Sequence, residues 1–573
     1  MKEMVVSVLK KALGNLKVRI SEAQLENLIE MPPSQDMGDY ALPCFFMSAM
    51  LKLDAHEIAM QVREEIGNIK ETDFEDITVN GPYVNFFLNR KSLARQTVWD
   101  IITKKKEYGK GKIGSRKRTM VEFPSPNTNK PLHLGHLRNM SIGESISRIL
   151  EFNSENVVRA DLFNDRGIHI CKSMLAYKKW GHESTPDKKK IKPDHFVGDF
   201  YVMFNSKGKA SKKAAAALEE EAAEMLRKWE AGDKGTLLLW KVMNDWAIQG
   251  FKETYKNFGI SHDVSFYESK VYKDGKDMVV LGLGKGVFQK GPEGEVKVDL
   301  TKEGLGEKIL LRKDGTSIYV VQDMGLAKAK FDRYKLDRSF YVVGNEQDHH
   351  FQVLFAILKK LGGKKEMKHI SYGMVNLPSG RMKSREGTVV DADDMIGQMK
   401  DMAEKELKKK EKLKAEELKK RSAAIALAAI KYFLLKVDIR KTMLFNPKES
   451  INFEGDTGPY LMYSYARASS IIRKSEESLS KFEVHDLEEK ELALVKKLSQ
   501  FPDAVSSSYK SLNPSVIANY SHELAQAFNE FYHKCPVIGS EEKETFRLAL
   551  VESFRQVMKN SLWLLGINTI EEM

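Results

Sequence analysis

Residues 124–139 read PSPNTNKPLHLGHLRN, and the rest of the chain is organised around this segment. It follows a short apolar run, MVEF at 120–123, and it precedes a helical pattern from Ile142 to Phe152. A strand, a turn rich in Pro and Asn, and a helix start are the parts of a βα nucleotide-binding unit. The segment therefore predicts an α/β domain of the Rossmann type.

Two histidines lie where the predicted helix begins. His133 and His136 are three residues apart, so they share one face of the helix. Backbone N–H groups and the helix dipole attract phosphate at this end, and Gly135 leaves room for a ligand on the backbone. Two imidazole N–H groups aimed at one phosphoryl centre stabilise charge that develops during displacement at phosphorus. The alternative is a pair of surface histidines without such a role, and the position between strand and helix favours the phosphate site.

The pattern S-P-N-x-x-K-P-x-H-x-G-H-L-R-N resembles the ATP-binding HIGH region of class I aminoacyl-tRNA synthetases. Its Ser-Pro-Asn lead-in and the lysine before proline are the version found in arginyl-tRNA synthetases. The resemblance implies that Lys130, His133 and His136 are catalytic, because they stabilise the phosphates of ATP. It also implies that Ser125 and Gly135 contact ATP.

The composition indicates a large protein with a polyanionic partner. The 573 residues allow roughly three or four domains. A hydrophobic content of 42% is ordinary for a chain with large cores. The formal net charge of +12 fits a nucleic acid first of all. A basic surface that binds nothing is the alternative that charge alone leaves open.

Other features predict a cytoplasmic protein. The three cysteines, Cys44, Cys171 and Cys535, are far apart in the sequence, so we expect neither a disulfide framework nor a zinc cluster. This cysteine usage predicts a reducing compartment. The N-terminus lacks the pattern of a secretory or transit signal. No run approaches the roughly 18 apolar residues of a membrane span. We therefore expect a soluble protein of the cytoplasm that does not contact a membrane.

Residues 1–112 are predicted to form an α+β domain. GDYA at 38–41 follows a turn-rich stretch, and TVNGPYVNFFL at 78–88 reads as two strands around a Gly-Pro turn. Both segments look like the N-terminal add-on domain of arginyl-tRNA synthetases, which contacts the D-loop of the tRNA. The resemblance makes Asn85 a candidate base contact beside aromatics that stack on bases, although core packing is the better interpretation for one face of the strand. The charged, Gly-rich stretch 104–112 sets the boundary.

Residues 113–445 are predicted to form the catalytic domain, with a mostly helical insertion at 175–260. Glu122 lies inside an apolar strand, where a carboxylate is costly unless it is paired. Its partner is either a substrate guanidinium or a cation of the protein itself. Asn127 lies just past the strand, where polar side chains reach bound ligands. In the arginine enzymes, the matching acid and asparagine hold the amino-acid substrate.

A second group of polar residues suits arginine. Tyr319 and Asp323 are four residues apart on a predicted helix, so a carboxylate lies beside an aromatic ring, and a planar guanidinium binds both. An apolar strand that ends at Gly344 is followed by Gln347 and His350, where ligand contacts gather in parallel sheets. The family places a glutamine at the position of Gln347 in the arginine pocket. It places ATP contacts in the turn from Gly344 to His350.

The stretch SGRMKSREGTVV, residues 379–390, resembles the KMSKS loop that contacts ATP phosphates in this class. Aligned on its methionine, the second lysine of KMSKS falls on Ser384, and basic residues flank that position. In many arginyl enzymes a lysine before the HIGH motif, here Lys130, is thought to stand in. The cation that meets pyrophosphate is left open among Lys130 and the two flanking residues. The implied catalytic cations of the loop are Lys383 and Arg385, and its implied ATP contacts are Met382 and Ser384.

Residues 446–573 are predicted to form an all-α bundle. DTGPYLMYSYAR at 456–467 opens a helix with polar capping residues. Tyr460, Tyr463 and Arg467 lie on one face of it, which suits base stacking and a phosphate contact. The stretch looks like the start of the anticodon-binding domain of arginyl-tRNA synthetases, so these three residues are implied tRNA contacts. Which tyrosines stack on bases and which pack in the core is left open.

The resemblance covers nearly the whole chain, in order, and implies an arginyl-tRNA synthetase. The expected parts are an N-terminal α+β add-on domain, a Rossmann-type catalytic domain with helical insertions, and an all-α anticodon-binding bundle. The implied reaction joins L-arginine to the 3′ end of tRNA(Arg) through an arginyl-adenylate, and it consumes ATP and releases AMP and pyrophosphate. Mg²⁺ accompanies ATP, no separate metal site is expected, and the family implies a monomer.

Three alternatives stay open. One is a class I synthetase for another amino acid, which the acidic pocket and the lack of Cys/His clusters disfavour. A second is a small nucleotidyltransferase with an H-x-G-H motif, which needs no two flanking domains. The third is a non-catalytic tRNA-binding paralogue. Decay of the histidines or of the basic loop would favour it, and both are intact apart from Ser384.

Overall fold

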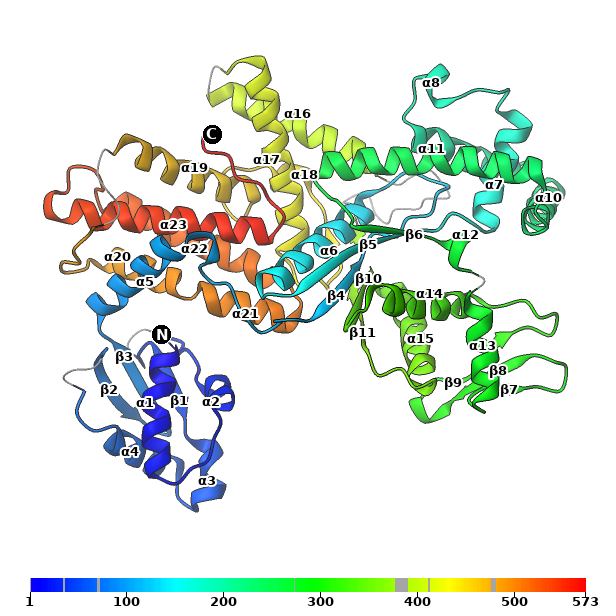
Figure 1. The fold of residues 1–573 in the computed structure, drawn as a ribbon. Helices are drawn as coiled ribbons and strands as arrows, with labels where there is room; N and C mark the ends of the chain where they lie inside the picture. Colours follow the sequence, from blue (N-terminus) through cyan, green and yellow to red (C-terminus); the bar gives the residue numbers. More distant parts are fainter. Residues whose placement is uncertain are drawn as a thin grey trace. The chain divides into compact units, whose positions relative to one another are not determined.

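The chain divides into two compact units in the computed structural model, whose elements are drawn in Figure 1. The first unit consists of Met1–Tyr108, Arg467–Pro502 and Glu523–Met558. The second consists of Gly109–Ala466, Asp503–His522 and Lys559–Met573. The structure describes residues 2–34, 37–69, 73–272, 274–376, 390–410, 413–475 and 481–573.

A parallel sheet of five strands lies in the second unit, in the order β11-β10-β4-β5-β6. The strands are β4 (Arg118–Glu122), β5 (Asn156–Phe163), β6 (Val264–Tyr267), β10 (Arg338–Gly344) and β11 (Glu366–Tyr372). The chain runs outward from β4 in one direction and returns to place β10 on its other side. This order confirms the predicted Rossmann type, and ligands of such sheets bind outside the carboxyl ends of the strands at the point of reversal.

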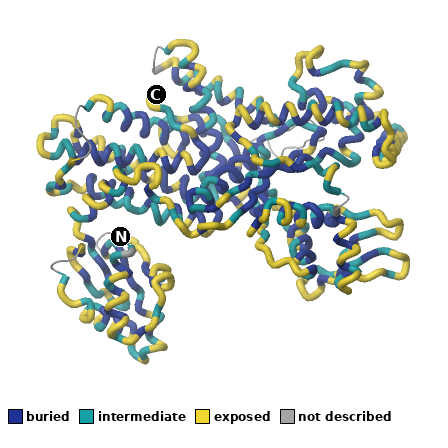
Figure 2. The backbone as a smooth tube through the Cα atoms, in the orientation of Figure 1, coloured by how far each residue is buried: buried dark blue, intermediate teal, exposed yellow. Residues whose placement is uncertain are grey.

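Helix α6 (Leu134–Phe152) follows β4 directly and packs against β4, β5 and β10. It is buried along most of its length, as Figure 2 shows, because other helices cover its outer side. Gly143 permits the close approach of the helix to the end of β4, since a Cβ atom there would lie 2.2 Å from Cγ of Phe123. The strand and the helix start predicted from residues 120–152 are therefore confirmed.

Helices fill the connection between β5 and β6, as the sequence predicts. They are α7 (Ile168–Trp180), α8 (Pro186–Lys189), α9 (Pro193–Gly208), α10 (Lys212–Glu230) and α11 (Lys234–Phe258). Helix α10 exposes most of its charged face, whereas α9 and α11 bury aromatic side chains against α7. The Lys/Glu face of α10 is thus a solvated surface.

The connection between β6 and β10 contains a small antiparallel sheet that the sequence did not reveal, in the order β7-β8-β9. Its elements are α12 (Glu268–Val271), α13 (Asp274–Gly284), β7 (Gln289–Lys290), β8 (Val296–Leu300), β9 (Gly306–Leu311) and α14 (Tyr319–Tyr334). The side chains Val296, Val298 and Leu300 of β8 are buried in one core with Val321 of α14. This core supports the start of α14.

Further elements of the second unit follow β10. They are α15 (Asp348–Lys360), β12 (Val375–Asn376), α16 (Ala392–Lys410), α17 (Ala415–Leu435), β13 (Met443–Leu444) and α18 (Pro447–Ser450). Strands β12 and β13 pair in parallel. Both α16 and α17 pack against α6 and against each other, so the outer side of α6 is closed to solvent.

The first unit begins with the predicted α+β fold, built on an antiparallel sheet in the order β1-β3-β2. Its elements are α1 (Lys2–Asn15), α2 (Glu22–Leu28), β1 (Tyr40–Pro43), α3 (Phe45–Leu51), α4 (Ala55–Ile66), β2 (Phe74–Asn80), β3 (Tyr83–Leu88) and α5 (Arg90–Lys104). Strands β2 and β3 meet at Gly81, whose φ of 54° suits a tight turn. The predicted Gly-Pro hairpin is confirmed.

The C-terminal part of the chain is helical, as predicted. Its helices are α19 (Gly458–Lys474), α20 (Glu489–Ser499), α21 (Phe501–Ser511), α22 (Ser515–Lys534) and α23 (Glu544–Leu564). In the first unit, the rings of Phe528 on α22 and Phe554 on α23 stack at 3.8 Å between centroids. Among the described residues, no helix has the length and apolar composition needed to cross a membrane.

Candidate active site

The two histidines of the H-x-G-H motif hold each other at the start of α6. The Nδ1 atom of His133 accepts a hydrogen bond from the Gly135 N–H at 3.1 Å. In return, Nδ1 of His136 accepts from the His133 N–H at 3.1 Å, and the two ring centroids lie 3.9 Å apart. This reciprocal cap satisfies backbone donors at the helix end. Because Nδ1 is an acceptor in both rings, the neutral imidazoles carry their protons on Nε2.

Both imidazoles are neutral at pH 7. Burial, together with the Lys130 ammonium, lowers the pKa of His133 to about 3. Burial lowers the pKa of His136 well below its ordinary value, and His133 and Lys130 add to the effect. The pair therefore offers two Nε2–H donors, and the positive charge beside them belongs to Lys130.

The chain that follows residues 377–389 is held against the motif. The Leu134 N–H donates to the Val390 carbonyl at 3.1 Å, and the Ala392 N–H donates to the Leu132 carbonyl at 3.0 Å. Residues 377–389 themselves lie outside the described residues. The predicted contacts of Met382, Lys383, Ser384 and Arg385 therefore stay predictions.

Arg138, one turn into α6, joins the motif to two distant segments. Its guanidinium is fully buried. Nη1 donates to the carbonyls of Gly373 and Met374, and Nη2 donates to those of Ile439 and Lys441, at 2.7–3.2 Å. These segments lead into β12 and β13. The sequence did not indicate this role, because the carbonyls come from positions more than 230 residues away.

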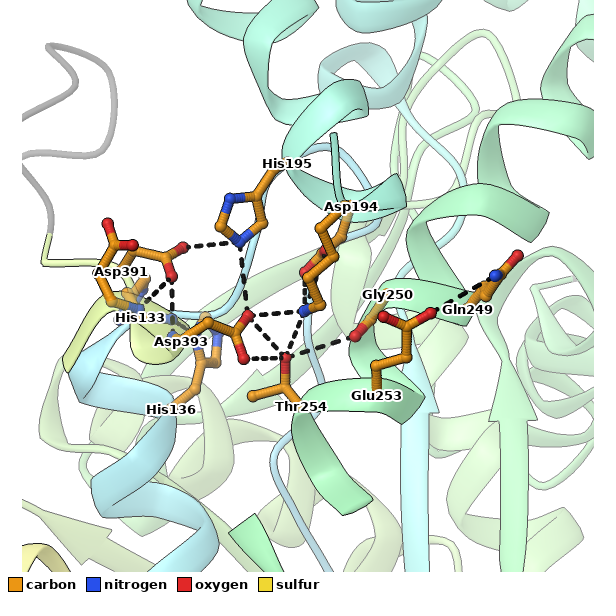
Figure 3. Close-up of polar contacts among 12 residues, drawn as sticks. His133, His136, Asp194, His195, Gln249, Gly250, Glu253, Thr254, Asp391 and Asp393 are labelled. Atoms are coloured by element: carbon orange, nitrogen blue, oxygen red, sulfur yellow. Dashed lines mark hydrogen bonds and ion pairs between the residues drawn. The ribbon is translucent and has the colours of Figure 1, made fainter. Parts of the chain in front are cut away.

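The insertion brings a cluster of charged side chains to the same place (Figure 3). Lys192 Nζ lies 2.6 Å from Oδ2 of Asp393 and 2.6 Å from Oγ1 of Thr254. His195 Nε2 lies 3.2 Å from Oδ2 of Asp391 and 3.4 Å from Oδ2 of Asp393. Asp393 is thus paired with the Lys192 ammonium, and both carboxylates lie within 3.4 Å of the His195 imidazole.

The pKa values of Asp393 and His195 shift in opposite directions. Burial raises the pKa of Asp393, but hydrogen bonds from His195 and Lys192 outweigh it, and the pKa falls to about 2. Burial lowers the pKa of His195, yet Asp393 and Asp391 raise it above its ordinary value. A cavity of about 160 Å³ lies between this cluster and the motif, and Lys130, His133 and His195 line it.

The structure brings together three of the residues predicted around arginine and ATP. Asp323 on α14 forms a hydrogen bond with His350 of α15, with 2.7 Å between Oδ2 and Nε2. The ring of Tyr319 lies 5.2 Å from that of His350 and is half exposed. The negative charge of Asp323 raises the pKa of Tyr319, and burial adds to the effect. The imidazole that the sequence assigned to ATP therefore touches the acid that it assigned to arginine.

Glu122 has a partner inside the protein. Its carboxylate forms an ion pair with Lys330 of α14, and both side chains are buried. The internal salt bridge that the sequence left open is therefore present, and the predicted contact of Glu122 with arginine stays a prediction. Asn127 and Gln347 are exposed at the carboxyl ends of β4 and β10.

The turn after β4 fixes two further predicted residues. Ser125 has a φ of 56°, and its N–H donates to Oδ1 of Asp161 at 3.2 Å. Gly344 ends β10, directly before the turn that carries Gln347. Both backbones therefore lie at the carboxyl edge of the sheet, where the sequence expects ATP.

Sequence reasoning missed an acidic group at the ends of β5 and β6. Burial raises the pKa of Asp161 and of Glu268 to about 7 in each case. Glu268 lies 3.9 Å from Nη1 of Arg166, and Asp165 accepts the hydroxyl of Ser269 at 2.6 Å. The signal was available for Glu268, because it directly follows an apolar strand, just as Asn127 and Gln347 lie shortly after theirs.

The predicted tRNA contacts differ in exposure. Asn85 is only 5% exposed within β3, so little of it reaches solvent, and its base contact stays a prediction. On α19, Tyr460, Tyr463 and Arg467 are half buried along one face, as the spacing predicts. In the first unit, Arg467 donates to Oδ1 of Asn529 at 2.6 Å.

A Rossmann-type sheet with an H-x-G-H motif at its point of reversal, flanked by an α+β domain and a helical bundle, defines a class I aminoacyl-tRNA synthetase. The family described as "tRNA synthetases class I (R), catalytic domain" matches residues 97–446. Residues 1–88 match the "Arginyl tRNA synthetase N terminal domain", and residues 461–573 match the "DALR anticodon binding domain". The chain belongs to the arginyl-tRNA synthetase family.

Relatives agree with this assignment, and solved structures share the fold. The chain is 45% identical to an arginine–tRNA ligase of Treponema denticola, over 95% of this chain and 94% of that protein. It is 47% identical to one of Parabacteroides distasonis, over 79% and 80%. The fold is similar to that of Thermus thermophilus arginyl-tRNA synthetase, with a TM-score of 0.86, 24% identity and full coverage of both chains. The arginyl-tRNA synthetase of Plasmodium falciparum gives a TM-score of 0.78 at 21% identity, over 100% and 99%.

Proposed function

We propose that this protein ligates L-arginine to the 3′ end of tRNA(Arg). The arginine carboxylate attacks the α-phosphate of ATP, the new acyl phosphate bond forms, and pyrophosphate leaves. A hydroxyl of the terminal ribose then attacks the carbonyl carbon of the arginyl-adenylate, and AMP leaves. The protein supplies orientation and electrostatics, and no covalent intermediate with the enzyme is required.

The observation that carries this proposal is the histidine pair at the start of α6. Its Nε2–H donors and the Lys130 ammonium suit the charge that develops on the phosphates. Lys383 and Arg385 are proposed to add charge there. The proposed ATP contacts are Ser125, Gly135, Gly344, His350, Met382 and Ser384.

For arginine, the proposal rests on the acid and aromatic ring of α14. Asp323 offers a carboxylate to the guanidinium, and the half-exposed ring of Tyr319 offers a stacking face. Glu122, Asn127 and Gln347 are proposed to complete the pocket. Mg²⁺ is proposed to arrive with ATP on its phosphate oxygens, because Asp393 and Asp391 already meet Lys192 and His195 of the protein.

The remaining assignments follow the same proposal. Residues 1–112 contact the D-loop through Asn85, residues 113–445 catalyse the reaction, and residues 446–573 bind the anticodon. Tyr460, Tyr463 and Arg467 are the proposed anticodon-side contacts. The protein is proposed to act as a monomer in the cytoplasm.

The test measures incorporation of each of the twenty radiolabelled amino acids into total tRNA, with ATP and Mg²⁺. We expect label from arginine alone. His136→Ala removes one of the two donors, so kcat falls about 10²–10³-fold. His182→Ala, at an exposed histidine beyond α7, is the matched control and keeps wild-type activity. tRNA binding without any labelling would favour a non-catalytic paralogue, and label from another amino acid would overturn the arginine pocket.

A further inference from the structure

Lys330 is a buried cation at the inner face of the candidate arginine pocket. Its side chain is fully buried on α14, and its ammonium pairs with Oε2 of Glu122. Nζ also lies 4.8 Å from the ring centroid of Tyr341 and 5.4 Å from that of Phe266. Tyr341 is the neighbour of Glu122 across β4 and β10. The pair is therefore enclosed on the protein side by strands and aromatic rings.

One helix carries both this cation and the proposed ligands of arginine. Tyr319 and Asp323 lie on the first turns of α14, and Lys330 lies seven residues after Asp323, which returns to the same face. Glu122 and Asp323 also act on the same groups: both raise the pKa of Tyr319, and both raise that of Lys330. The two carboxylates thus share one electrostatic neighbourhood at the carboxyl end of β4.

A carboxylate that is buried among strands and aromatic rings is costly unless a cation pairs with it. The side chain of Glu122 is only 6% exposed. An internal ammonium on one oxygen of Glu122 removes this penalty before the substrate arrives. The second oxygen of the same carboxylate then remains for a second cation.

We propose that Lys330 is a positioning residue for arginine: it compensates the buried charge of Glu122 and fixes one carboxylate oxygen, so that the other oxygen meets a cationic group of the substrate. The inference rests on the proposed arginine pocket. A purely structural ion pair is the alternative, in which Lys330 only compensates the charge of Glu122 and neither side chain affects substrate binding.

The test uses three variants, Lys330→Met, Glu122→Gln and the double variant. Lys330→Met leaves a buried carboxylate without a cation, so the thermal midpoint of this variant should fall. The double variant removes both charges and restores a midpoint near that of the wild type. Arginine KM, ATP KM, kcat and the midpoint are measured for each. Lys328→Met is the matched control, since Lys328 lies on the same helix in an exposed ion pair with Asp332.

We expect the arginine KM to rise about ten- to a hundredfold in each single variant, while the ATP KM stays within about twofold. The double variant should have the arginine KM of Glu122→Gln, because Lys330 acts through that carboxylate. Lys330→Arg restores a cation and should recover most of the arginine affinity.

Three results would overturn the inference. One is a double variant that regains both the wild-type midpoint and the wild-type arginine KM, since the pair would then be structural. Another is an unchanged arginine KM in all variants. The third is a double variant whose rise in arginine KM equals the product of the rises in the two single variants, because the two residues would then act independently. Failure of the proposed function is a separate outcome, because wild-type protein would then charge tRNA with another amino acid or with none.

Discussion

Arg138→Lys is the substitution that tests most directly how the H-x-G-H motif is held to the rest of the site. The guanidinium spreads its donors over two nitrogens: Nη1 reaches the carbonyls of Gly373 and Met374, and Nη2 reaches those of Ile439 and Lys441. Burial lowers the pKa of Arg138 to about 10, so the side chain is a cation at pH 7. A lysine keeps the charge but places its donors on a single atom.

The loss can be estimated from the geometry. One ammonium serves one of the two carbonyl pairs, so two charge-assisted hydrogen bonds disappear. Each contributes about 1.5–3 kcal/mol to stability when the donor is charged, which gives at least about 3 kcal/mol. The cost is local, because the affected carbonyls precede β12 and β13. About 3 kcal/mol corresponds to roughly a hundredfold change in an opening equilibrium.

Hydrogen exchange followed by mass spectrometry measures this opening. Peptides that cover residues 373–376 and 439–444 should exchange roughly a hundredfold faster in Arg138→Lys than in the wild type. We also expect a lower kcat, since the same helix presents His133 and His136. Arg333→Lys, at an exposed position of α14, is the control. Wild-type exchange in both peptides would refute the reasoning, because the four carbonyls would then not depend on a guanidinium.

Two further changes test other groups of the second unit. Burial lowers the pKa of Lys431 to about 7, and its ammonium donates to the Gly566 carbonyl at 2.7 Å. The folded protein therefore binds fewer protons than the unfolded chain between about pH 7 and 10.5. Its stability should rise with pH across that window, and Lys431→Met should flatten the rise in thermal midpoint. Asp323→Asn removes the charge that meets His350 and that is proposed to meet arginine; the arginine KM should rise about a hundredfold with the ATP KM within about threefold, and equal rises in both would contradict the assignment.

The sequence predicts the first βα unit well because its signals are local. An apolar run, a turn of Pro and Asn and a capped helix follow one another within residues 120–152, and each is set by neighbouring residues. The antiparallel sheet β7-β8-β9 was not predicted. Its strands are short: β8 alternates apolar and charged residues over only five positions, and in β9 the charged Glu307 and Lys308 precede three consecutive apolar residues.

The partners of buried charges could not be predicted. The cost of burying Glu122 was evident from the strand, but the sequence could not choose between a substrate and the protein as its partner. Lys330 lies 208 residues further along the chain, among many lysines with no distinguishing pattern. Arg138 likewise reads as an ordinary helical arginine until the carbonyls of two remote segments converge on it. Such pairings depend on topology, which local periodicity does not contain.

Helix α6 and the segments around it contribute differently to the electrostatics of the site. Since His133 and His136 are neutral at pH 7, they donate hydrogen bonds but bring no net charge to the phosphates. We expect the charge that balances the leaving pyrophosphate to come from Lys130, from groups outside the described residues, or from Mg²⁺ that arrives with ATP. Asp391 would oppose it, because its backbone lies beside His133. The insertion counteracts this: Lys192 pairs with Asp393, and Nε2 of His195 lies 3.2 Å from Oδ2 of Asp391. A helical insertion that looks remote from the chemistry in the sequence therefore contributes to the potential at the proposed phosphate site.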